Sequence, residues 1–147
     1  MKNFDTSDVL SVTTGRLVSS RHIDGVYEIL NFLTGDNLYT HQLPRAMREC
    51  EPWLRTQFPQ LMRDSPGMVT MLNCLNGMIA VDSGTLEARE KTIAEWVADV
   101  KKKFSLPDTL SVYEMGADMH THIDPVEEAQ AMVGDKRVIA LDLGRKV

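Results

Sequence analysis

The sequence predicts a mainly helical α+β fold in a single domain, residues 1–147, and three observations support this. Apolar residues recur with helical spacing through the N-terminal and middle parts of the chain. Two short apolar runs near the C-terminus, residues 110–115 and 138–143, have the composition of strands in a small sheet. Signals for a helix lie between these runs, over residues 125–133. The end of the chain is therefore predicted to be strand, helix and strand.

The N-terminal part contains one clear helix and one ambiguous segment. Residues 24–34 carry a single apolar stripe, with Asp24 placed to cap the helix and Gly35 just after its end. Residues 8–15 suit either a strand or a helix that ends at Gly15. The helix is favoured because glycine readily adopts the left-handed conformation that follows many helices.

The middle of the chain contains two predicted helices and one apolar run that fits two structures. One helix begins near Leu43, and Pro52 is expected to kink or restart it. Residues 68–81 fit a buried helix or a hairpin that turns at its Asn-Gly pair. Residues 85–104 form the clearest long helix, and the lysine run at its end suits the helix dipole. That run therefore has a structural explanation and does not require a nucleic-acid patch.

The C-terminal helix has the sharpest start in the sequence. Asp124 is placed as the cap, Pro125 takes the first helical position, and Glu127 can complete a capping box. Glu128 occupies the position where a hydrophobic staple would need an apolar side chain. A strand, helix and strand of this length permit a parallel pair with a right-handed crossover. No internal repeat is evident.

Composition and charge exclude several classes of protein. The net charge is −5, and residues 64–147 carry all of it, so bulk nucleic-acid binding is disfavoured. Cys50 and Cys74 form no CxxC pair, which argues against a disulfide scaffold or zinc site. Polar residues interrupt the longest apolar stretch, and the N-terminus lacks the apolar run of a signal peptide. We therefore expect no membrane association and a cytoplasmic location; the oligomeric state stays open.

A polar segment before the helix at Leu43 contains the best candidates for binding a ligand. His41, Gln42 and Arg45 lie where a helix N-terminus would attract an anion. Arg16, in the segment Thr-Thr-Gly-Arg, is a further candidate. The same residues could instead bond neighbouring loops, and this structural interpretation is favoured by a narrow margin.

Two histidines near the C-terminus raise the possibility of a metal site. His120 and His122 alternate on an extended segment, so their rings could point the same way towards Asp118 or Asp124. Asp124 is needed as a helix cap, however, and a solvated loop is the favoured interpretation. No motif for a nucleophile, a phosphate loop or a cofactor is present, so we expect no cofactor and do not favour an enzyme.

Several blocks of the sequence resemble an uncharacterised family of small proteins, encoded mainly by bacteriophages and prophages. The blocks are SVTTGRL from residue 11, GVYEILN from residue 25, TGD from residue 34, THQLPR from residue 40 and HIDPVEE from residue 122. The resemblance covers residues 8–60 and 118–143. It implies a phage origin, in the cytoplasm of a bacterial host, and supplies no catalytic residue.

Three functions follow as hypotheses. The first is a phage accessory protein that binds a host protein, such as an inhibitor of a defence system, since an acidic surface can mimic DNA. The second is a protein that binds or degrades a nucleotide or other small ligand, anchored by Arg16, His41, Gln42 and Arg45. The third is a metal-dependent hydrolase that uses His120 and His122.

Overall fold

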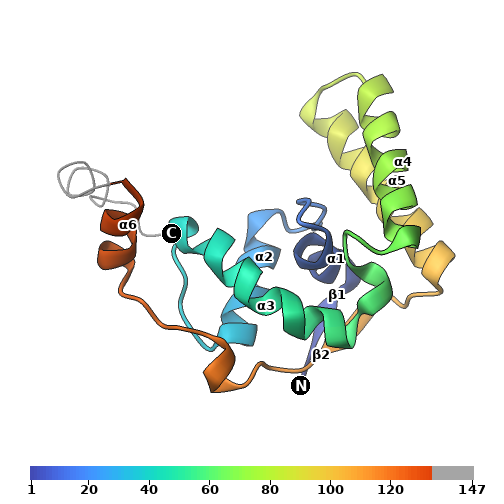
Figure 1. The fold of residues 1–147 in the computed structure, drawn as a ribbon. Helices are drawn as coiled ribbons and strands as arrows, with labels where there is room; N and C mark the ends of the chain where they lie inside the picture. The colour runs from blue at the N-terminus through green and yellow to red at the C-terminus, as the bar shows by residue number, and fades with distance from the viewer. Residues whose placement is uncertain (134–147) are drawn as a thin grey trace.

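The computed structural model describes residues 1–133 and shows a mainly helical α+β fold (Figure 1). The two strands are β1 (Lys2–Asp5) and β2 (Thr109–Val112). The α-helices of the described residues are α1 (Thr6–Thr14), α2 (Ile23–Thr34), α3 (Leu43–Gln57), α4 (Pro66–Val81), α5 (Leu86–Phe104) and α6 (Pro125–Val133). Short 3₁₀ helices are η1 (Thr40–Gln42), η2 (Pro59–Leu61) and η3 (Ala117–Met119).

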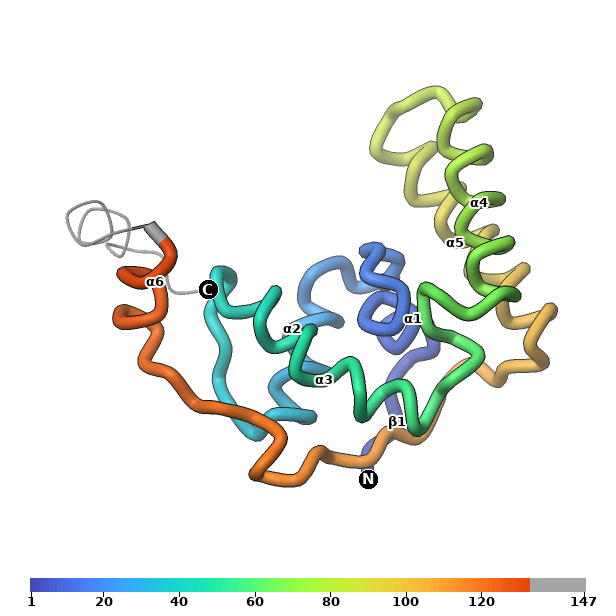
Figure 2. Tube along the Cα trace, viewed as in Figure 1, coloured from blue at the N-terminus to red at the C-terminus, as the bar shows by residue number. Residues whose placement is uncertain are grey.

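Helices α1, α2 and α3 form the body of the protein, and α4 and α5 form a helical hairpin that projects from it (Figures 1 and 2). β1 and β2 pair antiparallel, with Lys2 opposite Val112 and Asp5 opposite Thr109. After β2 the chain runs back along the body, and α6 lies beside the start of α3 (Figure 2). We call residues 113–133 the C-terminal arm.

Two clusters of buried side chains hold these parts together. One fills the body, where Phe4, Ile29 and Leu54 are almost fully buried. The other surrounds Trp96 of α5, which is fully buried and donates its indole N–H to the carbonyl oxygen of Met71 at 2.6 Å. Leu10 of α1 belongs to this second cluster, so the base of the hairpin packs against the body.

The structure confirms the helical predictions and decides the ambiguous ones. The helix over 24–34 is α2, and residues 8–15 are helical in α1, with Gly15 left-handed at φ 72°. The apolar run 68–81 is helix α4 and not a hairpin. Residues 85–104 match α5, whose cap Thr85 accepts a hydrogen bond from the N–H of Ala88 at 3.1 Å. No helix of residues 1–133 is long and apolar enough to cross a membrane.

One detail of the helix predictions is wrong, and one of the two alternatives at Pro52 is excluded. α2 begins at Ile23, so Asp24 lies in its first turn and His22 is the N-cap, without a side-chain bond. Pro52 lies inside α3, which continues to Gln57 without restarting. The helix continues because its apolar face stays packed on both sides of the proline, which outweighs the loss of one backbone donor.

The sheet also differs from the prediction. The strand expected over 110–115 covers Thr109–Val112, and its partner is the N-terminal β1 in an antiparallel pair. β1 has four residues, of which only Phe4 is buried, so its pattern is too short to stand out in the sequence. The expected strand 138–143, and any parallel pairing with it, lie outside the described residues.

An internal repeat of 20 residues, contrary to the sequence-based expectation, relates the ends of α1 and α2. Gly15 donates its N–H to the carbonyl of Ser11, and Gly35 donates to that of Asn31, with both glycines left-handed. The Ser11 hydroxyl then accepts a hydrogen bond from the N–H of Val18 at 3.0 Å. The Asn31 amide oxygen accepts the equivalent bond from the N–H of Leu38 at 2.9 Å. In both loops the hydroxyl of the threonine before the glycine accepts a hydrogen bond from the N–H of the residue after the glycine, at 3.2 Å.

The repeat is hard to detect in the sequence because few residues are identical in its two copies. Between residues 10–18 and 30–38 only a leucine, a threonine and the glycine are shared. The hydrogen bonds depend on side-chain oxygens, which serine and asparagine supply equally well. We call residues 15–22 the first loop and residues 35–42 the second loop.

A buried carboxylate joins α1, the first loop and α2. Asp8 is fully buried and accepts hydrogen bonds from the Ser19 hydroxyl and the Arg21 guanidinium. Arg21 also binds Glu28 of α2 at 2.6 Å. Gly25 leaves no room beside these groups, since a Cβ atom there would collide with Asp8 and Ser19. Any side chain at Gly25 must therefore displace the buried carboxylate.

We predict that Gly25→Ala lowers the free energy of unfolding by about 2 kcal/mol, because it overpacks a buried polar centre. Gly77→Ala is the matched control, since Gly77 lies in helix α4 with open space around it. There alanine is expected to raise stability by about 0.5–1 kcal/mol through helix propensity. Urea denaturation of both variants measures the difference, and equal effects at the two positions would contradict the prediction.

Candidate functional site

Three of the four predicted ligand residues lie together and contact the C-terminal arm. His41 and Gln42 belong to η1 in the second loop, and Arg45 lies in the first turn of α3. These elements face the start of α6, more than 80 residues further along the chain.

Glu128 of α6 is the centre of this contact. Arg45 binds the Glu128 carboxylate with two nitrogens, at 2.7 and 2.8 Å, and the Gln42 amide donates to it at 3.0 Å. Glu128 is 8% exposed. The hydrogen bond from Arg45 lowers the pKa of Glu128, and the same bond raises the pKa of Arg45. The bidentate geometry makes this a strong and directional contact.

The same side chains bind backbone carbonyls of the arm. Gln42 donates to the carbonyl oxygen of Ile123 at 3.0 Å, and Arg45 donates to that of Thr121 at 2.8 Å. His41 Nε2 lies 2.8 Å from the carbonyl oxygen of Pro125, so it is the donor of that bond. These residues therefore hold the arm against the body, while their binding of a ligand stays a prediction.

Arg16 does not share this location. It lies just after α1 and donates to the side-chain oxygen of Asn76 on α4 at 2.9 Å. The structure thus separates Arg16 from the three residues of the second loop and α3.

The two histidines of the arm meet carboxylates of the body. His120 Nδ1 lies 2.6 Å from Glu49 Oε1, and its Nε2 lies 2.9 Å from Asp36 Oδ2. His122 Nδ1 lies 2.9 Å from the same Asp36 oxygen. His120 therefore lies between two carboxylates of the body, one on each ring nitrogen.

The metal site expected at His120 and His122 stays a prediction. Among residues 1–133, no group of three or more His, Cys, Asp or Glu side chains is arranged to hold a metal ion. Both nitrogens of His120 already face carboxylates. Asp124 caps α6 as predicted, since it accepts from the N–H groups of Val126 and Glu127 at 3.1 and 3.2 Å.

The charged groups of this histidine–carboxylate cluster shift one another's pKa values. Burial raises the pKa of Asp36, but hydrogen bonds from His120, His122 and the Asn37 N–H outweigh burial and bring it to about 2. The hydrogen bond to Asp36 raises the pKa of His122 above its ordinary value of 6.5. Cys50 is not an available nucleophile, because burial raises the pKa of its thiol to about 12.

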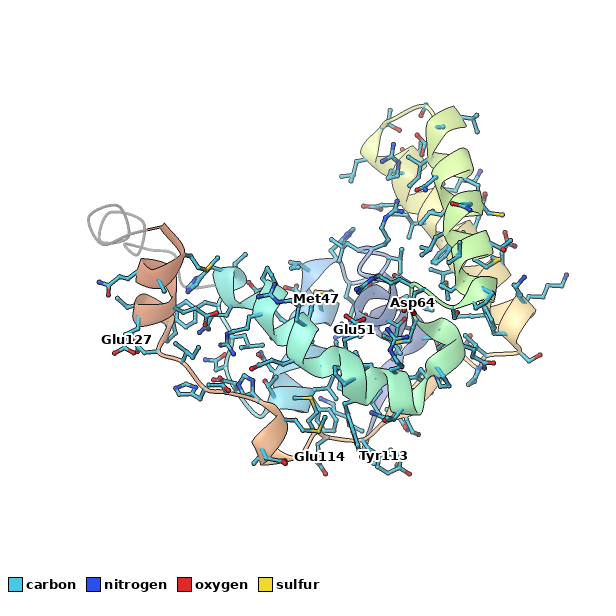
Figure 3. All side chains as sticks on the ribbon, viewed as in Figure 1. Met47, Glu51, Asp64, Tyr113, Glu114 and Glu127 are labelled. Carbon is cyan, nitrogen blue, oxygen red and sulfur yellow. The ribbon has the colours of Figure 1, made fainter. Side chains whose placement is uncertain are left out.

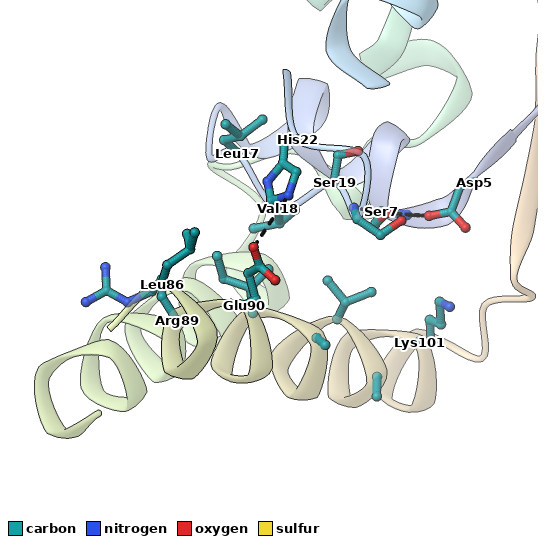
Figure 4. Close-up of a pocket in the computed structure, with 15 residues that line it drawn as sticks. Asp5, Ser7, Leu17, Val18, Ser19, His22, Leu86, Arg89, Glu90 and Lys101 are labelled. Carbon is teal, nitrogen blue, oxygen red and sulfur yellow. Dashed lines mark hydrogen bonds and ion pairs between the residues drawn. The ribbon is translucent and has the colours of Figure 1, made fainter. Parts of the chain in front are cut away.

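A groove of about 500 Å³ lies between the first loop and α5 (Figure 4). Val18 of the loop and Ile93, Val97 of α5 give it apolar walls. Leu17 and Leu86 line it while remaining 49% and 75% exposed. The sequence alone did not reveal this groove, because its two walls are more than 60 residues apart and only the helical stripe of α5 was visible.

The outer face of α4 has no charged side chain of its own, although Arg16 donates to Asn76 on it. The whole helix contains no Asp, Glu, Lys or Arg in 16 residues, although half of it faces solvent. The exposed residues are Pro66, Val69, Thr70, Asn73, Cys74, Asn76, Gly77, Ala80 and Val81. We call these residues the uncharged face of α4.

We predict that Glu128→Gln weakens the attachment of α6 by about 2 kcal/mol, because it removes the bidentate partner of the partly buried Arg45, which keeps only Glu49 as a carboxylate partner, at 3.0 Å. Hydrogen exchange of the α6 amides measures this local opening. Glu127→Gln is the control, since Glu127 is an exposed neighbour on α6 (Figure 3). Unchanged exchange in Glu128→Gln would show that the pair does not hold the arm.

We also predict that the attachment of the arm depends on pH. Because its pKa is raised, His122 contributes to the stability of the folded arm. This contribution is complete below pH 6.5 and is lost as the pH rises through the raised pKa. Because its pKa is lowered, Asp36 makes a second contribution to this stability, which is complete above pH 3.8 and is lost as the pH falls towards 2. The stability difference between wild type and His122→Gln should therefore be greatest between these limits. A constant difference from pH 4 to pH 9, measured by urea denaturation, would rule out this coupling.

Residues 4–64, which run from β1 to just beyond η2, match the family model of a domain of unknown function (DUF7736). The match includes both copies of the repeat and α3, but neither the α4–α5 hairpin nor the arm. No curated protein and no solved structure matches the chain. The body of the protein is therefore similar to an uncharacterised domain, which supports the resemblance to an uncharacterised family.

Proposed function

We propose that the protein acts by binding another protein through the uncharged face of α4. The observation that carries this proposal is a 16-residue helix, half exposed to solvent, without one charged side chain. A helix whose outer face meets only water normally carries charged residues there. Depletion of charge is a property of the central part of protein interfaces.

The position of α4 supports the same function. The hairpin projects from the body, so the uncharged face can be covered by a partner without moving the rest of the chain (Figure 1). Val69 and Val81 are 43% and 84% exposed at its two ends. These side chains offer apolar area that a partner would remove from water.

The charge of the chain indicates the chemistry of the partner. Residues 64–147 carry the whole net charge of −5, although α5 itself has exposed lysines, Lys91, Lys102 and Lys103, as well as exposed acidic residues. A net negative charge would steer a basic protein towards this half of the chain. A basic host protein that binds nucleic acid, including one of a defence system, fits this pattern.

The resemblance to phage and prophage proteins supplies the setting of this proposal. A phage accessory protein acts in the cytoplasm of its bacterial host, where its partner would be a host protein. Binding alone can inhibit such a partner, because an acidic protein seated on a basic surface excludes DNA from it. This requires no catalytic residue and no cofactor.

The test is affinity purification from infected host cells with the wild-type chain and two charge variants. Asn73→Lys places a charge on the uncharged face, and we expect at least tenfold less recovery of the partner because a desolvated lysine opposes docking. Gln60→Lys makes the same change at an exposed residue of η2, outside the hairpin, and should leave recovery unchanged. Equal recovery by both variants would refute the α4 interface.

A further inference from the structure

We propose that α5 also pairs with α5 of a second copy of the chain, antiparallel and around a two-fold axis. The contact uses the side of α5 that lines the groove, not the uncharged face of α4. It therefore stands independently of the function proposed above.

The contact surface is a single stripe along α5. Leu86, Glu90, Ile93, Val97 and Lys101 all line the groove, and their spacing of three or four residues places them on one side of the helix. The stripe spans 16 residues, and its ends lie about 22 Å apart at the rise of an α-helix. A surface of this length and shape suits another helix.

Helix α4 and the body leave part of the apolar surface of α5 uncovered. Trp96 and Val100 are fully buried on the covered side. On the groove side Leu86 is 75% exposed and Ile93 is only partly buried, whereas Val97 between them and Lys101 is 7% exposed. Ala94 and Ala98, both exposed, flank this side. Small side chains at these positions allow the axis of a second helix to approach closely.

The stripe is complementary to itself when it is reversed. The midpoint of Ile93 and Val97 is position 95, and the midpoint of Glu90 and Lys101 lies between positions 95 and 96. An axis at that height places Ile93 against Val97 of the second copy. The same rotation brings Glu90 beside Lys101 of the second copy, and each pair forms twice, as an isologous contact requires.

The charged groups of the stripe are available for this exchange. Glu90 faces His22 across the mouth of the groove at 3.6 Å, longer than a hydrogen bond (Figure 4). Lys101 binds Asp108 at 3.2 Å, but the side chain of Asp108 is 93% exposed. Exposed pairs of this kind contribute little and exchange readily. Opposite charges at matched positions therefore favour a second copy over an unrelated apolar segment.

Charge reversal of the full-length chain tests the pairing, with sedimentation velocity at increasing protein concentration as the measurement. The wild type should pass from monomer to dimer, and added salt should weaken the dimer. Glu90→Lys and Lys101→Glu should each weaken dimerisation at least tenfold, because each places like charges together. The double variant Glu90→Lys/Lys101→Glu should recover dimerisation, since it restores opposite charges in the reversed order.

Glu95→Lys is the matched control. Residue 95 is exposed at the height of the axis, but helical geometry places it on the opposite side of α5 from the stripe. The Glu95→Lys variant should therefore dimerise like the wild type. Circular dichroism of each variant checks that the helices are intact. A wild type that stays monomeric up to near-millimolar concentration, or a double variant that shows no recovery, overturns the proposal.

Discussion

The buried carboxylate of Asp8 is the constraint on which the body and its groove depend. A buried charge is costly unless it is paired and fully hydrogen-bonded. Ser19 and Arg21 meet this requirement, and both belong to the first loop, so the loop can take only one path. α2 must approach closely enough for Gly25 to touch the carboxylate. The position of the first loop, and with it one wall of the groove, follows from a single carboxylate in α1.

The repeat of 20 residues shows how one local structure supports two different contacts. Both loops leave a helix through a left-handed glycine and are held by side chains of that helix. The second loop ends in Gln42, which binds Glu128 of α6. The first loop ends in His22, at the equivalent position, which only approaches Glu90 of α5. The second loop therefore binds α6 through buried polar contacts, whereas the first loop leaves an apolar groove beside α5.

The sequence was sufficient to predict the helices, because each carries its own stripe and end signals, such as Gly15, Gly35 and the cap Asp124. It was insufficient for β1, since four residues with one buried side chain form no recognisable period. The partners of His41, Gln42 and Arg45 on the C-terminal arm lie more than 75 residues away. One signal was present in the sequence: Glu128 occupies a position where an apolar staple was expected. The carboxylate there pairs with Arg45, a partner that the local pattern does not identify.

The distribution of polar groups moves the functional interpretation from the N-terminal half to the hairpin. Polar side chains that looked free in the sequence are consumed by contacts within the chain, as Arg45 and His120 show. No buried side-chain polar atom of residues 1–133 lacks a hydrogen-bond partner. The exposed surface of α4, in contrast, includes apolar side chains such as Val69 and Val81 and carries no charge of its own. The proposal of a binding protein therefore rests on this exposed surface and not on the polar groups of the body.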